Sequence, residues 1–193
     1  VRGLDTVGYT DASHPVMREV TNAISLMTGA ELVESQACVD GCAIPAFSMP
    51  LVSVAAGFAR LGTGEGLSPS LACSAERIRS AIVQNPIMLS GEGRVDTCIT
   101  AECHGEVFVK SGAEGVMAAS IPALGYGLAV KINDGAQRAA TAVMADLLLQ
   151  VLQKHRLVTT KAKSVLEGHA RFRMKNWNGA DVGSVEPVSL AGS

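Results

Sequence analysis

The sequence predicts an α+β fold in which helices and a few strands form mixed layers. Apolar residues recur every three or four positions in several segments, which is the spacing of amphipathic helices. Shorter extended runs lie between these segments, without the regular alternation of strand and helix that a Rossmann sheet requires. Of the 193 residues, 48% are hydrophobic and 18% are charged. A chain of this size and composition is expected to bury a core rather than remain disordered.

Three helices are expected in the first half of the chain. The first covers residues 15–27 and has Ser13 as its N-cap. The second covers residues 51–61 and stops at a glycine-rich loop. The third has Ser74 as its N-cap and ends at Asn85, because a residue that precedes proline disfavours the helical conformation.

The second half is expected to contain two strands, a long helix and a short terminal sheet. The extended pieces cover residues 105–110 and 126–132, and the strongest helical stripe covers residues 136–155, with Asp134 as its N-cap. The tail is more polar. A turn at residues 176–179 precedes an alternating apolar pattern over residues 182–190, which predicts one or two strands.

Charge and composition exclude several classes of partner. Sixteen Lys and Arg residues against eighteen Asp and Glu residues give a formal net charge of −2, and only 4% of residues are aromatic. Nucleic-acid binding is not expected, because neither a basic stripe nor a stacking surface is present. The longest uncharged run, residues 41–59, contains Pro45 and Pro50 and is therefore predicted to be buried protein rather than a membrane span.

The cysteine count and the N-terminal sequence predict a location. Five cysteines, an odd number, lack the framework of a small disulfide-rich domain. The N-terminus shows no basic segment followed by an apolar one, so no signal peptide is predicted. We therefore expect a cytoplasmic protein that does not associate with membranes.

Two short motifs carry the candidate chemistry. Asp40-Gly41-Cys42 places a carboxylate and a thiol two residues apart, and a borderline-soft metal accepts both. Lys110-Ser111-Gly112 follows an apolar run and is expected at a strand end, where a lysine can polarise a serine. Serine enzymes that use such a triplet pair it with a Ser-x-x-Lys nucleophile, which is absent from this sequence. A surface lysine before a turn is the alternative interpretation of the triplet.

The remaining cysteines and histidines have simpler interpretations. Their spacings differ from the Cys-x-x-Cys pairs typical of zinc sites. Cys38, Cys73 and Cys98 are expected to be small buried residues. His169 lies in a basic stretch and is expected to be exposed.

Taken together, the motifs of this chain resemble the asparaginase II family, the rhizobial or thermolabile type of L-asparaginase. They occur in one order and span nearly all of the chain. The matching pieces are Tyr9 with His14-Pro15, Asp40-Gly41-Cys42 with Pro45 and Pro50-Leu51, Gly91-Glu92-Gly93-Arg94, Lys110 with Gly112-Ala113-Glu114-Gly115, Lys131-Ile132-Asn133-Asp134-Gly135, and Asn176-Trp177 with Gly179 and Val182-Gly183.

This resemblance implies an amidohydrolase that converts L-asparagine to L-aspartate and ammonia. It implies an architecture similar to serine β-lactamases and serine-dependent glutaminases, a serine nucleophile assisted by lysine, and a zinc site beside the substrate. By motif, Lys110 matches the catalytic lysine, Cys42 a zinc-ligating thiolate and Asp40 an acidic residue of the same pocket. Arg94 is assigned a contact with the substrate. We expect a homo-oligomer, specifically a homodimer.

The chain departs from the family pattern in three ways. Family members are longer, so residues 1–193 are expected to form a single region that corresponds to the C-terminal part of the enzyme. The N-terminal part of the same enzyme would supply the Ser-x-x-Lys pair and the remaining zinc ligands. Ala43 stands where glycine is more usual, and Asp96 where the rhizobial enzyme has cysteine. Two alternatives stay open: a non-catalytic binding or assembly subunit, and a metal-binding protein that uses Cys42.

Overall fold

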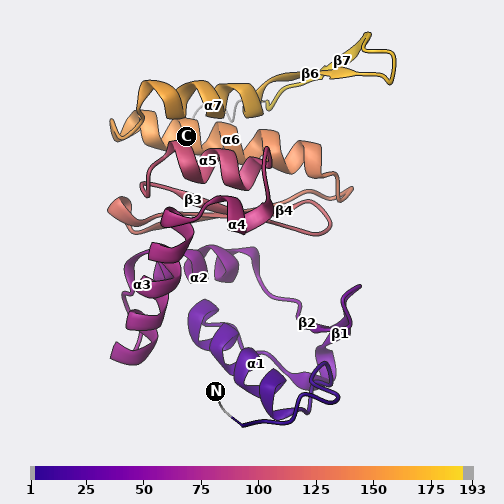
Figure 1. Ribbon diagram of the computed structural model, residues 1–193, viewed down its shortest axis with the longest axis vertical. Helices are drawn as coiled ribbons and strands as arrows, with labels where there is room; N and C mark the ends of the chain where they lie inside the picture. The colour runs from indigo at the N-terminus through magenta and orange to yellow at the C-terminus, as the bar shows by residue number, and fades with distance from the viewer. Residues whose placement is uncertain (1–2, 189–193) are drawn as a thin grey trace.

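The computed structural model describes residues 3–188 and has an α+β architecture with helices on both sides of a small antiparallel sheet (Figure 1). The central sheet has the strand order β3-β4-β5. Its strands are β3 (Phe108–Gly112), β4 (Val116–Ile121) and β5 (Tyr126–Lys131). Lys110 pairs with Ala118 on the middle strand. This register sets the position of Lys110, which lies within β3 rather than at its end as expected.

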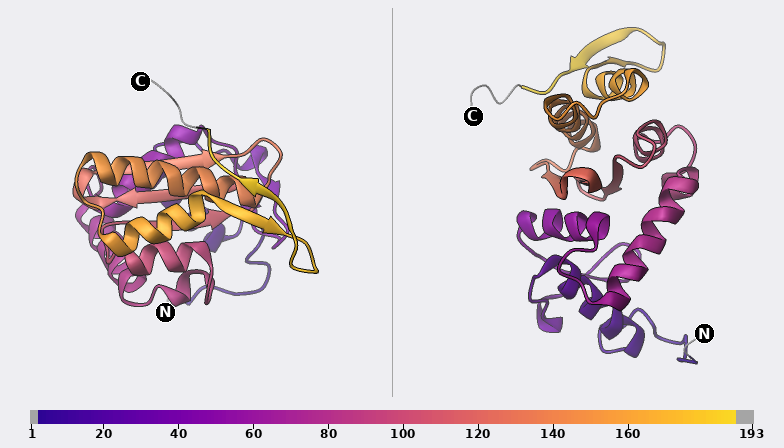
Figure 2. Two further views of the ribbon diagram at one scale, coloured as in Figure 1. Left: turned by 90° about the horizontal axis from the view of Figure 1, so that it is seen from above. Right: turned by 90° about the vertical axis from the view of Figure 1, so that its left-hand side faces the viewer.

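Helices cover the two faces of this sheet differently. Helix α2 (Leu51–Thr63) packs on one face, mainly against β5. On the other face, α5 (Val95–Glu102) contacts β3, and α6 (Gln137–Lys154) contacts β4. Helix α7 (Thr160–Ala170) lies beside α6, farther from the sheet (Figure 2). The sheet is therefore the middle layer of the molecule.

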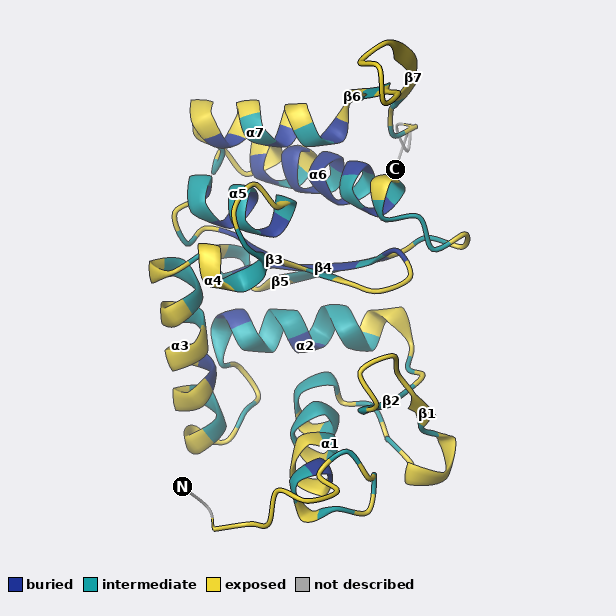
Figure 3. Cartoon of the chain, turned by 45° about the vertical axis from the view of Figure 1, so that its right-hand side comes forward, coloured by how far each residue is buried: buried dark blue, intermediate teal, exposed yellow. Residues whose placement is uncertain are grey.

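The hydrophobic core lies between the sheet and α6. The apolar stripe predicted for residues 136–155 is confirmed, because Met144 and Leu148 have no exposed surface and Leu152 is 1% exposed. Val109, Met117 and Ile121 of the sheet belong to the same cluster and are fully buried. Figure 3 shows the buried residues concentrated in this half of the molecule.

The N-terminal half lies on the opposite side of α2. Helix α1 (Pro15–Thr28) packs against α2, and so does α3 (Pro69–Gln84). A short 3-10 turn (Glu34–Gln36) leads into a hairpin of β1 (Cys38–Val39) and β2 (Pro45–Ala46). Figure 3 shows most of this hairpin exposed.

The remaining elements are short. Helix α4 (Ile87–Ser90) precedes α5, and a 3-10 turn (Pro122–Leu124) connects β4 to β5. At the C-terminal end, β6 (Phe172–Lys175) and β7 (Asp181–Val185) form an antiparallel hairpin. The predicted turn and a terminal strand are confirmed, while Leu190 of the predicted pattern lies outside the described residues. None of the helices within residues 3–188 has the length and apolar character needed to cross a membrane.

Two predicted N-caps of the first half are wrong. His14 caps α1, and its Nδ1 accepts from the N–H of Val16 at 3.2 Å. Helix α3 begins at Pro69, one residue after its N-cap Ser68, because proline is favoured in the first turn of a helix. Ser74 lies inside α3 and donates to the carbonyl of Ser70 at 3.0 Å.

The predicted cap of the long helix is also wrong. The N-cap of α6 is Ala136, whose side chain cannot accept a hydrogen bond. Asp134 binds the N-cap residue itself instead of the first turn of the helix, since its Oδ1 accepts from the N–H of Ala136 at 2.8 Å.

Among the longer elements, α5, β4 and α7 were not predicted, and neither were the short helix α4 and the β1–β2 hairpin. The sequence of β4, VMAASI, lacks alternation because five of its six residues are buried. The apolar stripe of α7 is narrow and consists of Ala162, Leu166 and Ala170. His169 of the same helix is half-buried, contrary to the expected exposure, and burial lowers the pKa of its imidazole.

The prediction that residues 41–59 are buried is wrong. Gly57 is the only residue of this run that is buried. The first part of the run belongs to the exposed β1–β2 hairpin. The second part belongs to α2, which is mostly half-buried because it packs between the sheet and α1.

Candidate active site

A buried carboxylate, Asp96, joins three segments at the start of α5. Its side chain has 0% of its surface exposed. The hydroxyl of Ser90, the last residue of α4, donates a hydrogen bond to Asp96 Oδ2 at 2.5 Å. Ser111 of β3 donates to the same oxygen through its hydroxyl at 2.8 Å and its backbone N–H at 3.0 Å. One carboxylate oxygen therefore holds α4, α5 and β3 together.

Lys110 adds a fourth donor to this group. Its Nζ lies 3.3 Å from Asp96 Oδ2 and 2.7 Å from the carbonyl oxygen of Ser111. The Lys110 side chain is 47% exposed, so the ammonium group lies where a buried acid meets solvent. An ammonium group has three N–H donors. The two partners found within residues 3–188 leave one donor available to a bound molecule.

The pKa of Asp96 reflects opposing influences. Burial, the largest single influence, disfavours the charged carboxylate. The hydrogen bonds from Ser90 and Ser111, with the positive charge of Lys110, together outweigh burial and hold the pKa below its ordinary value of 3.8. Asp96 is therefore ionised near neutral pH and is a weak base. The Ser111 hydroxyl donates to this weak base, so it is not activated as a nucleophile in this arrangement.

Sequence reasoning did not identify Ser90 or Asp96 as site residues. An acidic residue in the first turn of a helix is normally explained by the helix dipole and solvent exposure. The signal that identifies Asp96 is its burial, which depends on β3 approaching from fourteen residues farther along the chain. Spacing within the sequence does not show this approach.

Arg94 is the N-cap of α5, two residues before Asp96. Its side chain is exposed and makes no capping hydrogen bond. The backbone thus brings Arg94 to the same end of α5 as Asp96. Its predicted contact with the substrate stays a prediction.

The Asp40-Gly41-Cys42 motif forms the turn of the β1–β2 hairpin. Asp40 Oδ1 accepts from the N–H of Gly41 at 2.7 Å, and Cys42 Sγ lies 3.7 Å from Asp40 Oδ2. The carboxylate and thiol are therefore neighbours, as their spacing indicates. Both side chains are exposed on the hairpin.

The backbone of this turn explains the unusual alanine. Ala43 has φ +66°, in the left-handed region that favours glycine. Its N–H donates to the carbonyl of Asp40 at 2.8 Å, which closes the turn. The position that the family resemblance assigns to glycine is thus one where the backbone conformation favours glycine.

The structure keeps the two predicted halves of the site apart. Figures 1 and 3 place the β1–β2 hairpin on the α1 side of α2, whereas β3 lies in the sheet on the other side. The arrangement of residues 3–188 therefore does not place Cys42 and Lys110 in one pocket.

The described residues do not complete a zinc site. No group of three or more His, Cys, Asp or Glu side chains among them is placed to hold a metal ion. Asp40 and Cys42 provide two neighbouring donors, whereas zinc in proteins is held by three or four protein ligands. Their chemistry suits zinc, but their number does not.

The other cysteines offer no further ligand set. Cys38 and Cys73 are exposed, so the prediction that they are buried is wrong, and Cys98 is half-buried. Cys38 belongs to the two-stranded hairpin, and Cys73 lies in α3. Burial, with the nearby charges of Glu102 and Glu106, raises the pKa of Cys103 to about 12, which keeps its thiol protonated.

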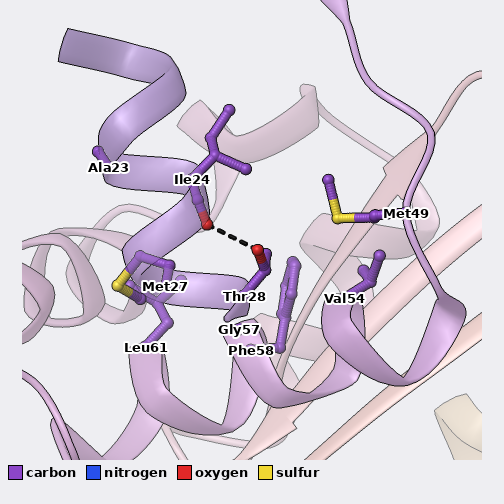
Figure 4. A pocket seen from close by; sticks show the side chains of 9 residues that line it. All are labelled: Ala23, Ile24, Met27, Thr28, Met49, Val54, Gly57, Phe58 and Leu61. Carbon is purple, nitrogen blue, oxygen red and sulfur yellow. Dashed lines mark hydrogen bonds between the residues drawn. The ribbon is translucent and has the colours of Figure 1, made fainter. Parts of the chain in front are cut away.

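An apolar cavity of about 370 Å³ between α1 and α2 lies elsewhere (Figure 4). Its only side-chain hydroxyl belongs to Thr28, which donates to the carbonyl of Ile24 at 2.8 Å. The lining has no charged group to bind a polar amide. We therefore assign the candidate site to the Asp96–Lys110 region rather than to this cavity. The lining consists of Ala23, Ile24, Met27, Thr28, Met49, Val54, Gly57, Phe58 and Leu61.

Comparison with known proteins identifies the family. The family model described as L-asparaginase II matches residues 1–187. A search of curated proteins gave no match. The family match covers the Asp40–Cys42 turn, the Asp96–Lys110 pair and the β6–β7 hairpin in one alignment. The chain belongs to the L-asparaginase II family.

Proposed function

We propose that this protein is an amidohydrolase that converts L-asparagine to L-aspartate and ammonia. Family membership supports the reaction class. The structural observation that carries the proposal is the half-exposed Lys110 ammonium, which is held against the buried Asp96 carboxylate. The orientation of the Lys110 ammonium is thus defined, and one of its N–H donors remains for a bound molecule. A residue that acts on a polar substrate requires both.

The proposed chemistry has two balanced steps. A serine oxygen attacks the side-chain amide carbon of asparagine, the carbon–nitrogen bond breaks, and the serine proton leaves with ammonia. Water then cleaves the ester and releases aspartate. The role of Lys110 is to donate a hydrogen bond that orients and polarises the reacting groups, because charge develops on oxygen as the carbonyl is attacked.

The nucleophile is proposed to come from the N-terminal part of the same enzyme, outside residues 1–193. Two observations support this assignment. The sequence contains no Ser-x-x-Lys motif. Ser111, the serine beside Lys110, donates to a carboxylate whose low pKa makes it a poor proton acceptor. In this proposal, the 193 residues form one region of the enzyme and contribute one wall of the pocket.

The decisive test is asparagine hydrolysis by the full-length protein and its Lys110→Met variant. We expect the wild type to release ammonia from L-asparagine and Lys110→Met to lose about 100-fold or more in kcat, the usual cost of removing one hydrogen-bond donor that stabilises developing charge. Lys163→Met is the matched control, since the Lys163 side chain is also 47% exposed but pairs with the exposed Glu167. It should retain wild-type activity.

Two outcomes would contradict this proposal. A full-length wild type that releases no ammonia would favour a non-catalytic binding or assembly subunit. An active wild type whose kcat is unchanged in Lys110→Met would remove Lys110 from the mechanism.

We propose separately that Cys42 is a zinc ligand, with Asp40 beside it and the remaining ligands outside these residues. The support is the 3.7 Å contact between the two side chains. Cys42→Ser should lower the zinc content of the purified full-length protein, because a thiolate is a stronger zinc ligand than a hydroxyl. Cys73→Ser, which changes another exposed cysteine, should leave it unchanged. Equal zinc content in all three proteins would contradict the assignment.

A further inference from the structure

We propose that Asp96 is a positioning residue, which acts by fixing Lys110 and Ser111 rather than by touching the substrate. This inference rests on the proposed function of Lys110. It adds that the direction of the Lys110 ammonium is set by a carboxylate on a different element, α5, and that Ser90 in turn fixes this carboxylate.

The distribution of hydrogen bonds on Asp96 is the first argument. Four donors converge on Oδ2, whereas Oδ1 is buried and has no partner among the described residues. Asp146, the other carboxylate buried within residues 3–188, uses both oxygens, since Oδ1 pairs with Arg171 at 3.0 Å and Oδ2 accepts from Gln150 at 2.6 Å. Asp146 therefore has a partner on each carboxylate oxygen, as a purely structural ion pair does. Within the described part of the chain, Asp96 instead makes all its hydrogen bonds through the one oxygen that faces Lys110.

Burial is the second argument. Removing a charged carboxylate from water is costly unless its partners are well arranged. Asp96 has 0% exposure, and its partner Lys110 is 47% exposed. Three hydrogen bonds from Ser90 and Ser111 fix the Asp96 carboxylate in place. The Lys110 ammonium that pairs with it is therefore restricted in its orientation. A lysine on a strand surface without such an anchor samples many rotamers.

The position of Lys110 within β3 is the third argument. Its backbone is fixed by pairing with Ala118, and Ser111, the next residue, supplies both an acceptor for Nζ and two donors to Asp96. The Lys110 ammonium, the Ser111 carbonyl and the Asp96 carboxylate thus form a closed arrangement. Removing the charge of Asp96 ends the ion pair and leaves Lys110 Nζ with neutral acceptors, the Ser111 carbonyl among them.

The activity test is a double-mutant cycle in the full-length enzyme. Asp96→Asn keeps the side-chain shape and removes the charge. We expect kcat to fall about 100-fold, the size of effect produced by a misplaced catalytic group, while KM changes little. In the Lys110→Met background the same substitution should have no further effect, because Asp96 acts through Lys110. Asp146→Asn is the control for loss of a buried carboxylate and should retain kcat.

A second readout does not require activity. In the full-length protein, the modification rate of each lysine by an acylating reagent is followed by mass spectrometry. Asp96→Asn should increase the rate at Lys110 several-fold and leave Lys163 unchanged. Ser90→Ala, which removes one hydrogen bond from Asp96 and keeps its charge, should give a smaller increase at Lys110. Ser90→Ala also provides a measurement should Asp96→Asn not fold.

The outcomes separate this inference from the proposed function. An inactive wild type overturns the asparaginase proposal. In that case the lysine modification rates by themselves test whether Asp96 fixes Lys110. An active, Lys110-dependent enzyme in which Asp96→Asn keeps wild-type kcat, or lowers it equally in both backgrounds, overturns the positioning role. Unchanged modification of Lys110 in both Asp96→Asn and Ser90→Ala overturns it as well.

Discussion

At the scale of single residues, the ionised state of Asp96 contributes to stability as well as to the site. Its pKa in the folded protein is below the ordinary value of 3.8, because the hydrogen bonds and the charge of Lys110 outweigh the effect of burial. A carboxyl group with a lowered folded pKa stabilises the protein above its unfolded pKa. That contribution is lost as pH falls through the folded pKa.

Asp96→Asn should therefore change the pH dependence of unfolding. Near neutral pH the variant should be less stable than the wild type by about 2 kcal/mol, the range for a hydrogen bond to a charged group. The asparagine does not titrate, so this difference should shrink below about pH 4. Urea unfolding followed by circular dichroism across that range measures it. A difference that is constant with pH would show that the charge of Asp96 does not contribute.

At the scale of elements, the contact between α2 and β5 depends on one glycine. A Cβ added to Gly127 would lie 1.8 Å from the carbonyl oxygen of Ala55 and 2.7 Å from the backbone nitrogen of Ala59. Both atoms belong to the backbone of α2, which cannot move as a flexible side chain does. The absence of a side chain at Gly127 is therefore what allows α2 to lie directly on the sheet.

Gly127→Ala should destabilise the protein by about 3 kcal/mol, because the helix must shift away from the strand to relieve the overlap. Gly168→Ala in α7 is the matched control, since no atom lies within 4 Å of the added Cβ. The control should stabilise the protein by up to about 1 kcal/mol through its higher helix propensity. Thermal unfolding of both variants tests the pair. Equal effects would show that the close approach does not limit packing.

The elements also show which local signals suffice for prediction. Helices α1, α2 and α6 have broad apolar stripes, and the sequence predicts them within a few residues. Strand β4 and helix α7 were missed, because β4 is buried on both faces and α7 buries only a narrow stripe. In both cases the neighbouring layers stabilise an element whose own periodicity is weak.

At the scale of the whole molecule, α2 separates two regions with different candidate roles. The sheet side holds Lys110 and Asp96 over the main hydrophobic core, and the α1 side holds the Asp40–Cys42 turn on an exposed hairpin (Figure 1). The two motifs lie on opposite sides of α2, and the prediction that one pocket contains both stays a prediction. The homodimer and the cytoplasmic location also stay predictions, since neither follows from the fold of one chain.

The sequence by itself determined the α+β class, the principal helices and the family, and it singled out Lys110 and the Asp40–Cys42 turn as candidates. These follow from periodicity and from motifs whose residues are close together along the chain. Only the tertiary structure decided that Asp96 and Ser90 belong beside Lys110, and that Cys42 lies apart from it. The physical reason is burial: a carboxylate becomes a precise anchor only when packing of α4, α5 and β3 removes it from water and supplies its donors.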